Sequence, residues 1–181
     1  MVAKELPPEE KKKVIEKETV KILEKREERN EKGDTIALKD KDLRSFLPKK
    51  IGAYVPSGDF VGNPYQASGA SFSNAEQDYS DGQNHLRITL VDYNSAQGQH
   101  AQEIARWRAD LAVETRREKG GSFVLDDMIG WEMYHKESQR AEIMLAVSDR
   151  IMLTIIADNQ EDTAFLKYVA KQMRLKTLAN Y

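Results

Sequence analysis

The side chains that could carry out chemistry are scattered along this sequence. Its three histidines, His85, His100 and His135, each stand alone in their segment. His100 and Glu103 would share one face of a helix, and they could supply two ligands of a metal site if a third came from elsewhere. We expect His100 instead to lie in an exposed first turn of a helix and His135 to be packed at the rim of a sheet. The histidines therefore predict no metal site, and no residue is assigned a catalytic role or a cofactor.

Two acidic clusters have the spacing of turns rather than of ligand sites. Asp81 is followed by a glycine, as in part of a calcium-binding loop, but that loop needs a glutamate six residues after the glycine, where this chain has Ile88. Asp126 and Asp127 could act as a general acid and base only inside a cleft, and nothing in the sequence places them in one. We expect both clusters to be turn residues. The motifs GxxxxGK[ST], GxGxxG, HExxH and GxSxG are also missing from the sequence.

Aromatic residues interrupted by glycine, proline and serine are the best candidates for a contact surface. Residues 58–69 favour a mobile loop, and such a loop with aromatic neighbours suits a peptide, lipid or protein partner. Further along, a basic run of mixed charge surrounds Trp107, which favours a solvated helix face and leaves an anion-binding patch as the alternative. We predict that a ligand or partner contacts a set of aromatic and basic residues: Tyr54, Phe60, Tyr65, Phe72, Arg106 and Trp107.

Length, charge and composition exclude several classes of protein. The chain has 181 residues, which is enough for one domain that buries roughly 70% of its unfolded surface. Its 28 basic and 30 acidic residues give a net charge of −2, so we do not expect a general nucleic-acid binder. Without cysteine there is no disulfide, thiolate zinc site or cysteine nucleophile. Because the apolar stretches are only a few residues long, we expect no insertion of the chain into a membrane.

Residues 1–34 have the composition of a charged helical arm. From Glu9 to Lys32, 17 of 24 positions are Asp, Glu, Lys or Arg, with no glycine or proline between them. Pro7 and Pro8 suit the first turn of a helix, so we predict one long and largely solvated helix that serves as a spacer. The alternative is self-association, giving a monomer or weak dimer, through a short stripe of four residues: Ile15, Thr19, Ile22 and Leu23. Gly33 marks the boundary to a single domain at residues 35–181.

The rest of the chain has the periodicity of an α+β domain. A short helix at about 40–46 stops before Pro48, a strand follows at 52–55, and a mobile loop is expected to about residue 67. Asp81-Gly82 predicts a hairpin between strands at about 69–79 and 85–93. The strongest amphipathic pattern predicts a helix that Gly120-Gly121 ends. We expect that helix at about 97–119. Four strands of a meander follow at about 123–126, 130–135, 141–147 and 150–157, and a closing helix at about 162–175.

These elements predict an α+β fold with an antiparallel sheet of about six to seven strands. The short links between the later strands cannot carry parallel crossovers, which is why the sheet is expected to be antiparallel. The last two strands are apolar on both alternating sets of residues, so both of their faces should be buried. We therefore expect helices on both faces of the sheet, the one that carries Trp107 on one face and the closing helix on the other.

Several segments resemble an uncharacterised domain of bacterial envelope proteins. They are Phe46-Leu47-Pro48 before Ile51-Gly52, residues 69–76 leading to Tyr79, residues 88–93, Gly130 at the start of a strand, and residues 147–150 in a tight turn. The element order is similar to that of the PsbP-like α/β/α sandwiches, whose bacterial members include secreted proteins and lipoproteins. The resemblance covers residues 36–178. It implies an accessory or binding role outside the cytoplasm and supplies no catalytic residues.

The expected location and partners follow from this resemblance. If an export signal has been removed from the chain, we expect the periplasm or cell envelope, and otherwise the cytoplasm. The partner would be a protein or a small ligand of the envelope and not a nucleic acid. The sequence thus predicts a non-enzymatic binding or accessory module. There are two alternatives. One is a structural self-association domain, and the other is an enzyme without a recognisable motif that uses His135 with Asp126 and Asp127.

Overall fold

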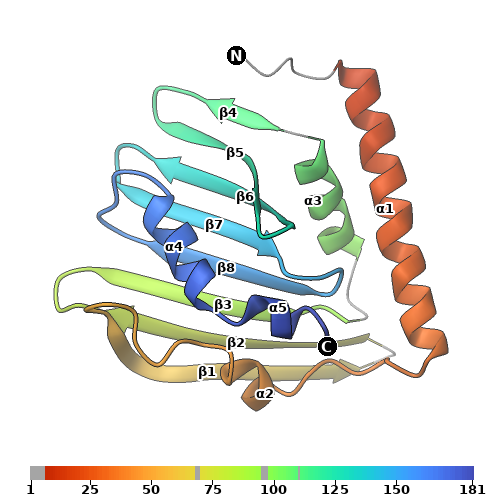
Figure 1. Cartoon of the computed structure of the whole chain (residues 1–181), viewed down its shortest axis with the longest axis horizontal. Helices are drawn as coiled ribbons and strands as arrows, with labels where there is room; N and C mark the ends of the chain where they lie inside the picture. Colours follow the sequence, from red (N-terminus) through yellow and green to blue (C-terminus); the bar gives the residue numbers. More distant parts are fainter. Residues whose placement is uncertain (1–6, 68–69, 95–97, 110) are drawn as a thin grey trace.

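One open antiparallel sheet dominates the computed structural model, which describes residues 7–67, 70–94, 98–109 and 111–181 (Figure 1). Its eight strands in these residues are β1 (Val55–Ala67), β2 (Ala70–Ser80), β3 (His85–Asp92), β4 (Ala112–Glu114), β5 (Glu118–Leu125), β6 (Met128–His135), β7 (Arg140–Ala146) and β8 (Ile151–Ala157). Their order across the sheet is β1-β2-β3-β8-β7-β6-β5-β4, and all neighbours are antiparallel. The predicted α+β class and the antiparallel meander are confirmed.

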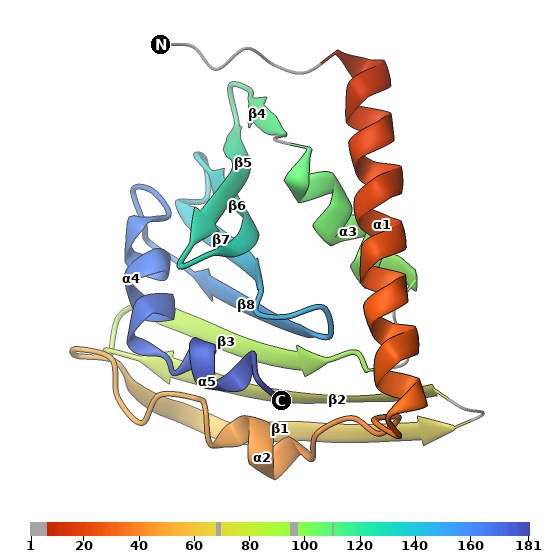
Figure 2. The same ribbon diagram turned by 45° about the vertical axis from the view of Figure 1, so that its right-hand side comes forward.

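Helices cover both faces of this sheet, as expected. The described helices are α1 (Pro8–Glu31), α2 (Asp40–Arg44), α3 (Gly98–Arg108), α4 (Ala164–Gln172) and α5 (Leu175–Leu178). The views in Figures 1 and 2 place α2, α4 and α5 toward one face, while α3 lies on the other and α1 runs along α3. α3 belongs to the connection between β3 at the centre of the sheet and β4 at its edge. It therefore has to cross the face that it covers.

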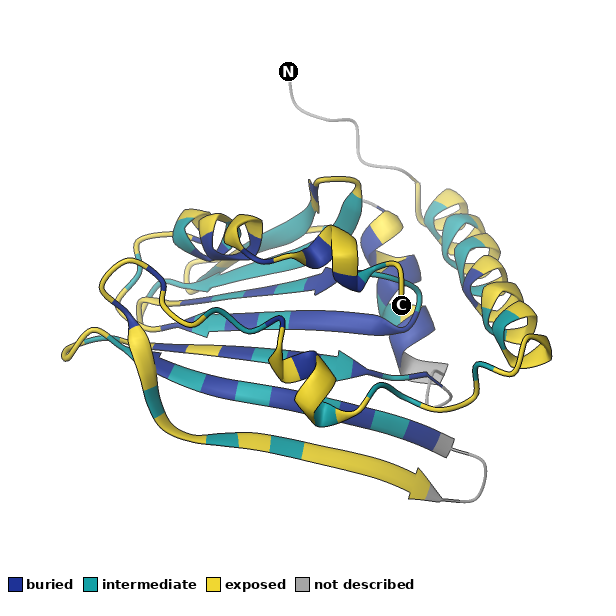
Figure 3. Cartoon of the chain, turned by 60° about the horizontal axis from the view of Figure 1, so that its bottom comes forward, coloured by how far each residue is buried: buried dark blue, intermediate teal, exposed yellow. Residues whose placement is uncertain are grey.

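Two apolar clusters fill the spaces on either side of the sheet. The larger lies toward α2, α4 and α5, and it includes Leu43, Leu166 and most of the buried side chains of the central strands. The smaller joins α1 and α3 to the sheet through residues such as Ile22 and Trp107. Alternation along β3 explains the division, because its even-numbered residues are buried and the residues between them are half-buried or exposed. Figure 3 shows this alternation along the inner strands and the exposed edge strand β1.

The prediction of a mobile loop before residue 67 is wrong, because β1 occupies that segment. Val55–Ala67 pairs with β2 along most of its length, and residues 68 and 69 of the predicted loop lie outside the described residues. An edge strand tolerates Pro56 and Pro64, since one side of its backbone needs no partner. The register shifts between Ser57 and Val61, where Gly58 has a positive φ of 71°. This bulge accommodates the composition that favours a loop.

The prediction of one helix from 97 to 119 is also wrong beyond Arg108. α3 ends there, the short strand β4 follows, and β5 already begins at Glu118; residues 97 and 110 lie outside the described residues. Gly120-Gly121, expected to end the helix, lies inside β5. A Cβ on Gly120 would come within 2.5 Å of the backbone oxygen of Glu132 on β6, so glycine permits a close approach of the two strands. The strand β4 is also the reason that the sheet has eight strands rather than six or seven.

Both acidic turns are in the predicted places. Asp81 and Gly82 connect β2 to β3, and the side chain of Asp81 accepts hydrogen bonds from the backbone N–H groups of the two residues after the glycine. Asp126 and Asp127 form the two-residue turn between β5 and β6, with positive φ angles of 49° and 70°. Two consecutive positive φ angles match the tight hairpin turn that fits the strand twist. The predictions of turn residues are therefore confirmed for Asp81, Asp126 and Asp127, whereas Asp78, the other member of the first acidic cluster, lies in β2.

Candidate functional site

The six predicted binding residues do not form one site. Tyr54 and Trp107 are buried, with 8% and 2% of their surfaces exposed, in the clusters on opposite faces of the sheet. The ring of Tyr54 packs against that of Phe165 on α4, with centroids 5.5 Å apart. Both aromatic side chains thus support the core. Neither offers a surface to a partner.

The other four lie nearer the solvent. Tyr65 and Phe72 stack across the β1–β2 pair with ring centroids 4.8 Å apart, and Tyr65 remains 48% exposed. The guanidinium of Arg44 covers the Phe60 ring at 4.4 Å. Arg106 is exposed on α3 and forms an ion pair with the carboxylate of Glu103, one turn earlier in the helix. The structure therefore brings only Tyr65 and Phe72 together.

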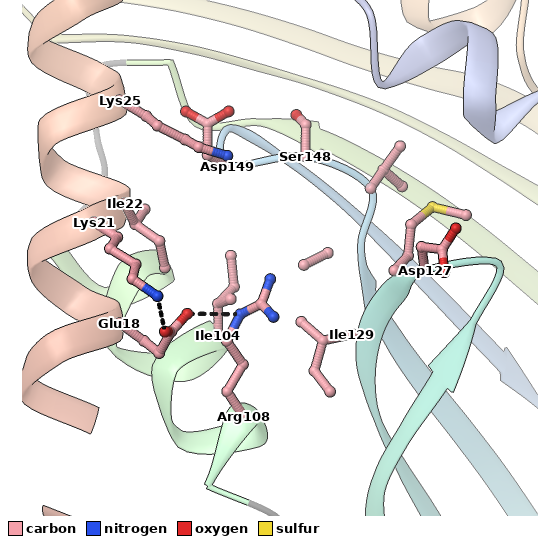
Figure 4. Close-up of a pocket in the computed structure, with 13 residues that line it drawn as sticks. Glu18, Lys21, Ile22, Lys25, Ile104, Arg108, Asp127, Ile129, Ser148 and Asp149 are labelled. Carbon is pink, nitrogen blue, oxygen red and sulfur yellow. Dashed lines mark hydrogen bonds and ion pairs between the residues drawn. The ribbon is translucent and has the colours of Figure 1, made fainter. Parts of the chain in front are cut away.

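A groove forms where α1, α3 and two hairpin turns meet (Figure 4). It has a volume of about 180 Å³. Its floor is apolar, with Ile22 from α1, Ile104 from α3 and Ile129 from β6. Ile22 and Ile104 are buried residues of the smaller core cluster, so the floor continues directly into the packed interior.

Charged side chains from four segments surround the floor. Glu18, Lys21 and Lys25 come from α1, and Arg108 comes from the last turn of α3. Asp127 and Asp149 come from the turns β5–β6 and β7–β8. Figure 4 shows the Lys25 side chain reaching toward Asp149 across the upper rim. The rim thus presents cations and carboxylates side by side.

Glu18 is the centre of the ion pairs on this rim. Its carboxylate lies 2.6 Å from Lys21 Nζ and 3.2 Å from Arg108 Nε (Figure 4). The hydrogen bond from Lys21 lowers the pKa of Glu18, against a smaller opposite effect of burial, and the charge of Arg108 adds to the lowering. Glu18 therefore stays ionised and links α1 to α3. By contrast, Lys25 makes no ion pair within the described part of the chain.

A second set of ion pairs fixes the end of α1 beside the groove. Arg29 bonds to the carboxylate of Asp149, and its Nε lies 3.5 Å from Asp34 just after the helix. Asp34 in turn bonds to the buried Arg150. The turn that carries Asp149 is thereby held against α1. The geometry of the groove thus depends on these contacts.

His100 lies in the interior of the protein. The prediction that it occupies an exposed first turn of a helix is therefore wrong. This histidine is 3% exposed and stacks on Tyr93 with ring centroids 4.7 Å apart. His100 is buried because the first turn of α3 faces the end of β3. His135 is half-buried at the end of β6, and its Nδ1 lies 3.2 Å from Glu118. No group of three or more His, Asp or Glu residues that could hold a metal occurs in the described part of the chain.

The sequence alone did not indicate the groove. Lys21, Lys25 and Asp127 were each interpreted as solvated helix or turn residues. The only local signal is the spacing of Ile15, Glu18, Ile22 and Arg29, which places them along one side of α1. That side is the one that packs toward α3, where Ile22 is buried.

Comparisons with protein-family models, with curated proteins and with solved structures gave no match. Among the described helices, none is long and apolar enough to cross a membrane.

Proposed function

We propose that this protein is a non-enzymatic binding module that takes an apolar side chain of a protein partner into the groove between α1 and α3. The observation that carries the proposal is the apolar floor of Ile22, Ile104 and Ile129 inside a charged rim. An apolar centre with a polar border is the usual anatomy of a protein interface. The volume of about 180 Å³ suits one large side chain rather than a cofactor.

The rim would select the residues around that side chain. Lys25 has no ion-pair partner in the described residues, and Asp127 has none either, so each can pair with an opposite charge on a partner. Lys21 and Arg108 share one carboxylate, that of Glu18. Charged groups at a rim favour the correct partner and speed its association more than they add affinity. A partner segment with an apolar residue between an acidic and a basic residue fits this arrangement.

A random peptide library displayed on phage tests the proposal. Peptides enriched on the wild-type protein are expected to share an apolar residue flanked by charges. Ala146→Leu places a larger side chain in the floor and should weaken their binding at least tenfold, while Lys25→Glu should favour different flanking charges. Ala53→Leu, at an exposed position before β1, is the matched control. Enriched peptides that bind the Ala146→Leu protein as well as the wild type would contradict the proposal, and so would a library without enrichment.

The place of action remains part of the proposal. The resemblance of residues 36–178 to bacterial envelope domains supports an accessory role there. Self-association through Ile15, Thr19, Ile22 and Leu23 is the competing function. Because Ile22 is already buried within the chain, that stripe is shortened, although Leu23 is 37% exposed. Native mass spectrometry distinguishes the two, since a dimer lost on Leu23→Ser would favour self-association.

A further inference from the structure

A larger hollow lies on the opposite face of the sheet, where the start of α4 stands over β5 and β6. Its volume is about 510 Å³, within the range of roughly 300–1,000 Å³ that small-molecule sites occupy. The residues that line it come from β5, from β6 and Lys136 after it, from residues 161–163 before α4, and from α4 itself. None of them lines the groove between α1 and α3. The hollow is therefore a separate candidate site.

Strand register explains why space is left here. Lys119 lies opposite Tyr134 across the β5–β6 pair, and Gly121 lies opposite Glu132. These four positions share one face of the sheet, because paired residues point the same way and alternate residues repeat. Gly121 has no side chain, so a gap separates Lys119 from Phe123 along β5. The half-buried Tyr134 borders the hollow into which this gap opens.

Most polar groups around the hollow already have partners. Glu132 accepts a hydrogen bond from the Thr163 hydroxyl, and its carboxylate lies 2.8 Å from Lys167 Nζ. The same ammonium lies 4.7 Å from the centre of the Phe123 ring. These contacts join the start of α4 to the sheet. Glu132 and Lys167 are therefore occupied in holding the walls of the hollow.

Lys119 differs from the other lysines of the hollow. Lys136 bonds to Glu114 and donates to the Thr115 carbonyl oxygen at 2.8 Å. Glu114 is the residue opposite Lys119 on β4, and it is the hydrogen bond from Lys136 that most lowers its pKa. Lys119 itself makes no side-chain hydrogen bond or ion pair in the described residues. Its charge contributes to the lowered pKa of Glu114, and its ammonium group can still donate to an anion.

We propose that this hollow binds a small aromatic carboxylate. The ring of the ligand would lie over the gap at Gly121 beside the Tyr134 ring, and its carboxylate would accept a hydrogen bond from Lys119. Aromatic rings favour offset-stacked or edge-to-face contacts, and the volume of the hollow leaves room for either. A charge-assisted hydrogen bond from an ammonium is about twice as strong as a neutral one, so the anion is preferred over a neutral analogue.

Binding of 2-naphthoate, followed by its own fluorescence and by amide shifts of the protein, tests the proposal. Saturable binding is expected, with shifts at residues of β5, β6 and the start of α4. Lys119→Gln should weaken it about tenfold, and the neutral 2-naphthamide should bind the wild type about as weakly. Ala164→Leu places a side chain in the hollow and should weaken binding of both compounds. Lys50→Gln and Ala53→Leu, both at exposed positions outside the hollow, are the matched controls.

Three results would overturn the proposal. The first is no saturable binding of 2-naphthoate at millimolar concentration. The second is equal affinity of the wild-type and Lys119→Gln proteins, and the third is shifts confined to other parts of the chain. Since Lys119 is exposed, a folding defect cannot account for lost binding in its variant. The outcome is independent of the peptide experiment, because Ala146 does not line the hollow and Lys119 does not line the groove.

Discussion

The guanidinium of Arg150 forms a two-point contact with the carboxylate of Asp92 in the interior of the protein. Its Nε and Nη2 atoms lie 2.9 and 2.5 Å from the two carboxylate oxygens, and the side chains are 3% and 0% exposed. Asp34 bonds to the same guanidinium through Nη1 at 2.9 and 2.6 Å. Asp92 also accepts the backbone N–H of Leu38 at 2.8 Å. One ionic cluster thus joins β3, β8 and the segment that follows α1.

Removing one member of this cluster should be costly. Burial alone would lower the pKa of Arg150, but the hydrogen bonds and charges of Asp92 and Asp34 outweigh it and raise the pKa. Asp92→Ala leaves this buried cation with one of its two carboxylate partners, so we expect a loss of about 3–5 kcal/mol in the free energy of unfolding. Urea unfolding followed by tryptophan fluorescence measures it.

An exposed ion pair provides the comparison for Asp92. Asp78→Ala removes one of the two carboxylate partners of Arg87, which is 50% exposed, and should cost less than about 1 kcal/mol. If the two variants lost equal stability, the buried cluster would have no special role. A double variant that replaces Asp92 and Arg150 by apolar residues should recover part of the loss, because no unpaired charge then stays buried.

Local patterns were sufficient to predict the parts of the fold whose pairing partners are close in sequence. The Asp81-Gly82 hairpin, the meander from β5 to β8 and the closing helix are of this kind. The helix predicted up to residue 119 failed because its pattern continues through Leu111 and Ala112. In the structure the Leu111 carbonyl oxygen accepts a hydrogen bond from Ser122 N–H, so strand pairing overrides the local preference.

The groove could not be predicted for a related reason. Its lining comes from α1, α3, β6, β7 and two turns, and Glu18 meets Arg108 only because α1 folds back along α3. No spacing within one segment encodes that contact. The arm was interpreted as solvated because its apolar stripe is short. Most of α1 is exposed, but in the structure the buried Ile22 and a few ion pairs attach this helix to the rest of the chain.

His100 should make the stability of the protein depend on pH. Neither ring nitrogen has a hydrogen-bond partner in the described residues. Burial lowers the pKa of His100 to about 4; the charges of Asp149 and Asp92 oppose this effect and that of Arg29 adds to it. In the unfolded chain the imidazole has a pKa of about 6.5. Between these two values the unfolded chain binds a proton that the folded protein does not, so stability falls as pH falls.

The size of this effect can be tested with an aromatic replacement. The separation of the two pKa values corresponds to about 3 kcal/mol, all of it lost once the pH is below about 4. His100→Phe retains a ring against Tyr93 without a titrating group, so its unfolding free energy should fall less through this window. His85→Phe, at an exposed position, serves as the control. Equal pH profiles of the wild-type and His100→Phe proteins would contradict the assignment.

α1 should be the part of the protein that is most sensitive to salt. Ile22 is its only buried residue, and its links to the rest of the chain include the ion pairs Glu18–Arg108 and Arg29–Asp149 and the Arg29–Asp34 contact that follows. Raising the salt from about 0.1 M to about 1 M shortens the screening length from ~10 Å to ~3 Å, which weakens such partly exposed pairs. We expect faster hydrogen exchange of the α1 amides, while α4, with three buried apolar residues, changes little.

A variant identifies the contact responsible for this salt effect. Glu18→Gln removes the link to Arg108, so α1 should exchange faster at low salt and respond less to added salt. Glu24→Gln, at an exposed position of the same helix, is the control. If α1 and α4 responded to salt alike, the attachment of α1 would not be electrostatic.

The two neighbouring glycines of β5 should differ in their tolerance of a methyl group. A Cβ on Gly120 would lie 2.5 Å from the backbone oxygen of Glu132, which the paired strand holds in place, whereas at Gly121 the nearest atom, the Leu111 oxygen, is 3.2 Å away. Gly120→Ala should therefore cost about 2–3 kcal/mol and Gly121→Ala about 1 kcal/mol or less, as measured by urea unfolding. Equal losses would mean that β5 and β6 can separate without penalty. Both glycines border the hollow, but a methyl group on Gly120 would point to the opposite face of the sheet. Only the Gly121→Ala protein should therefore also bind 2-naphthoate more weakly while it remains folded.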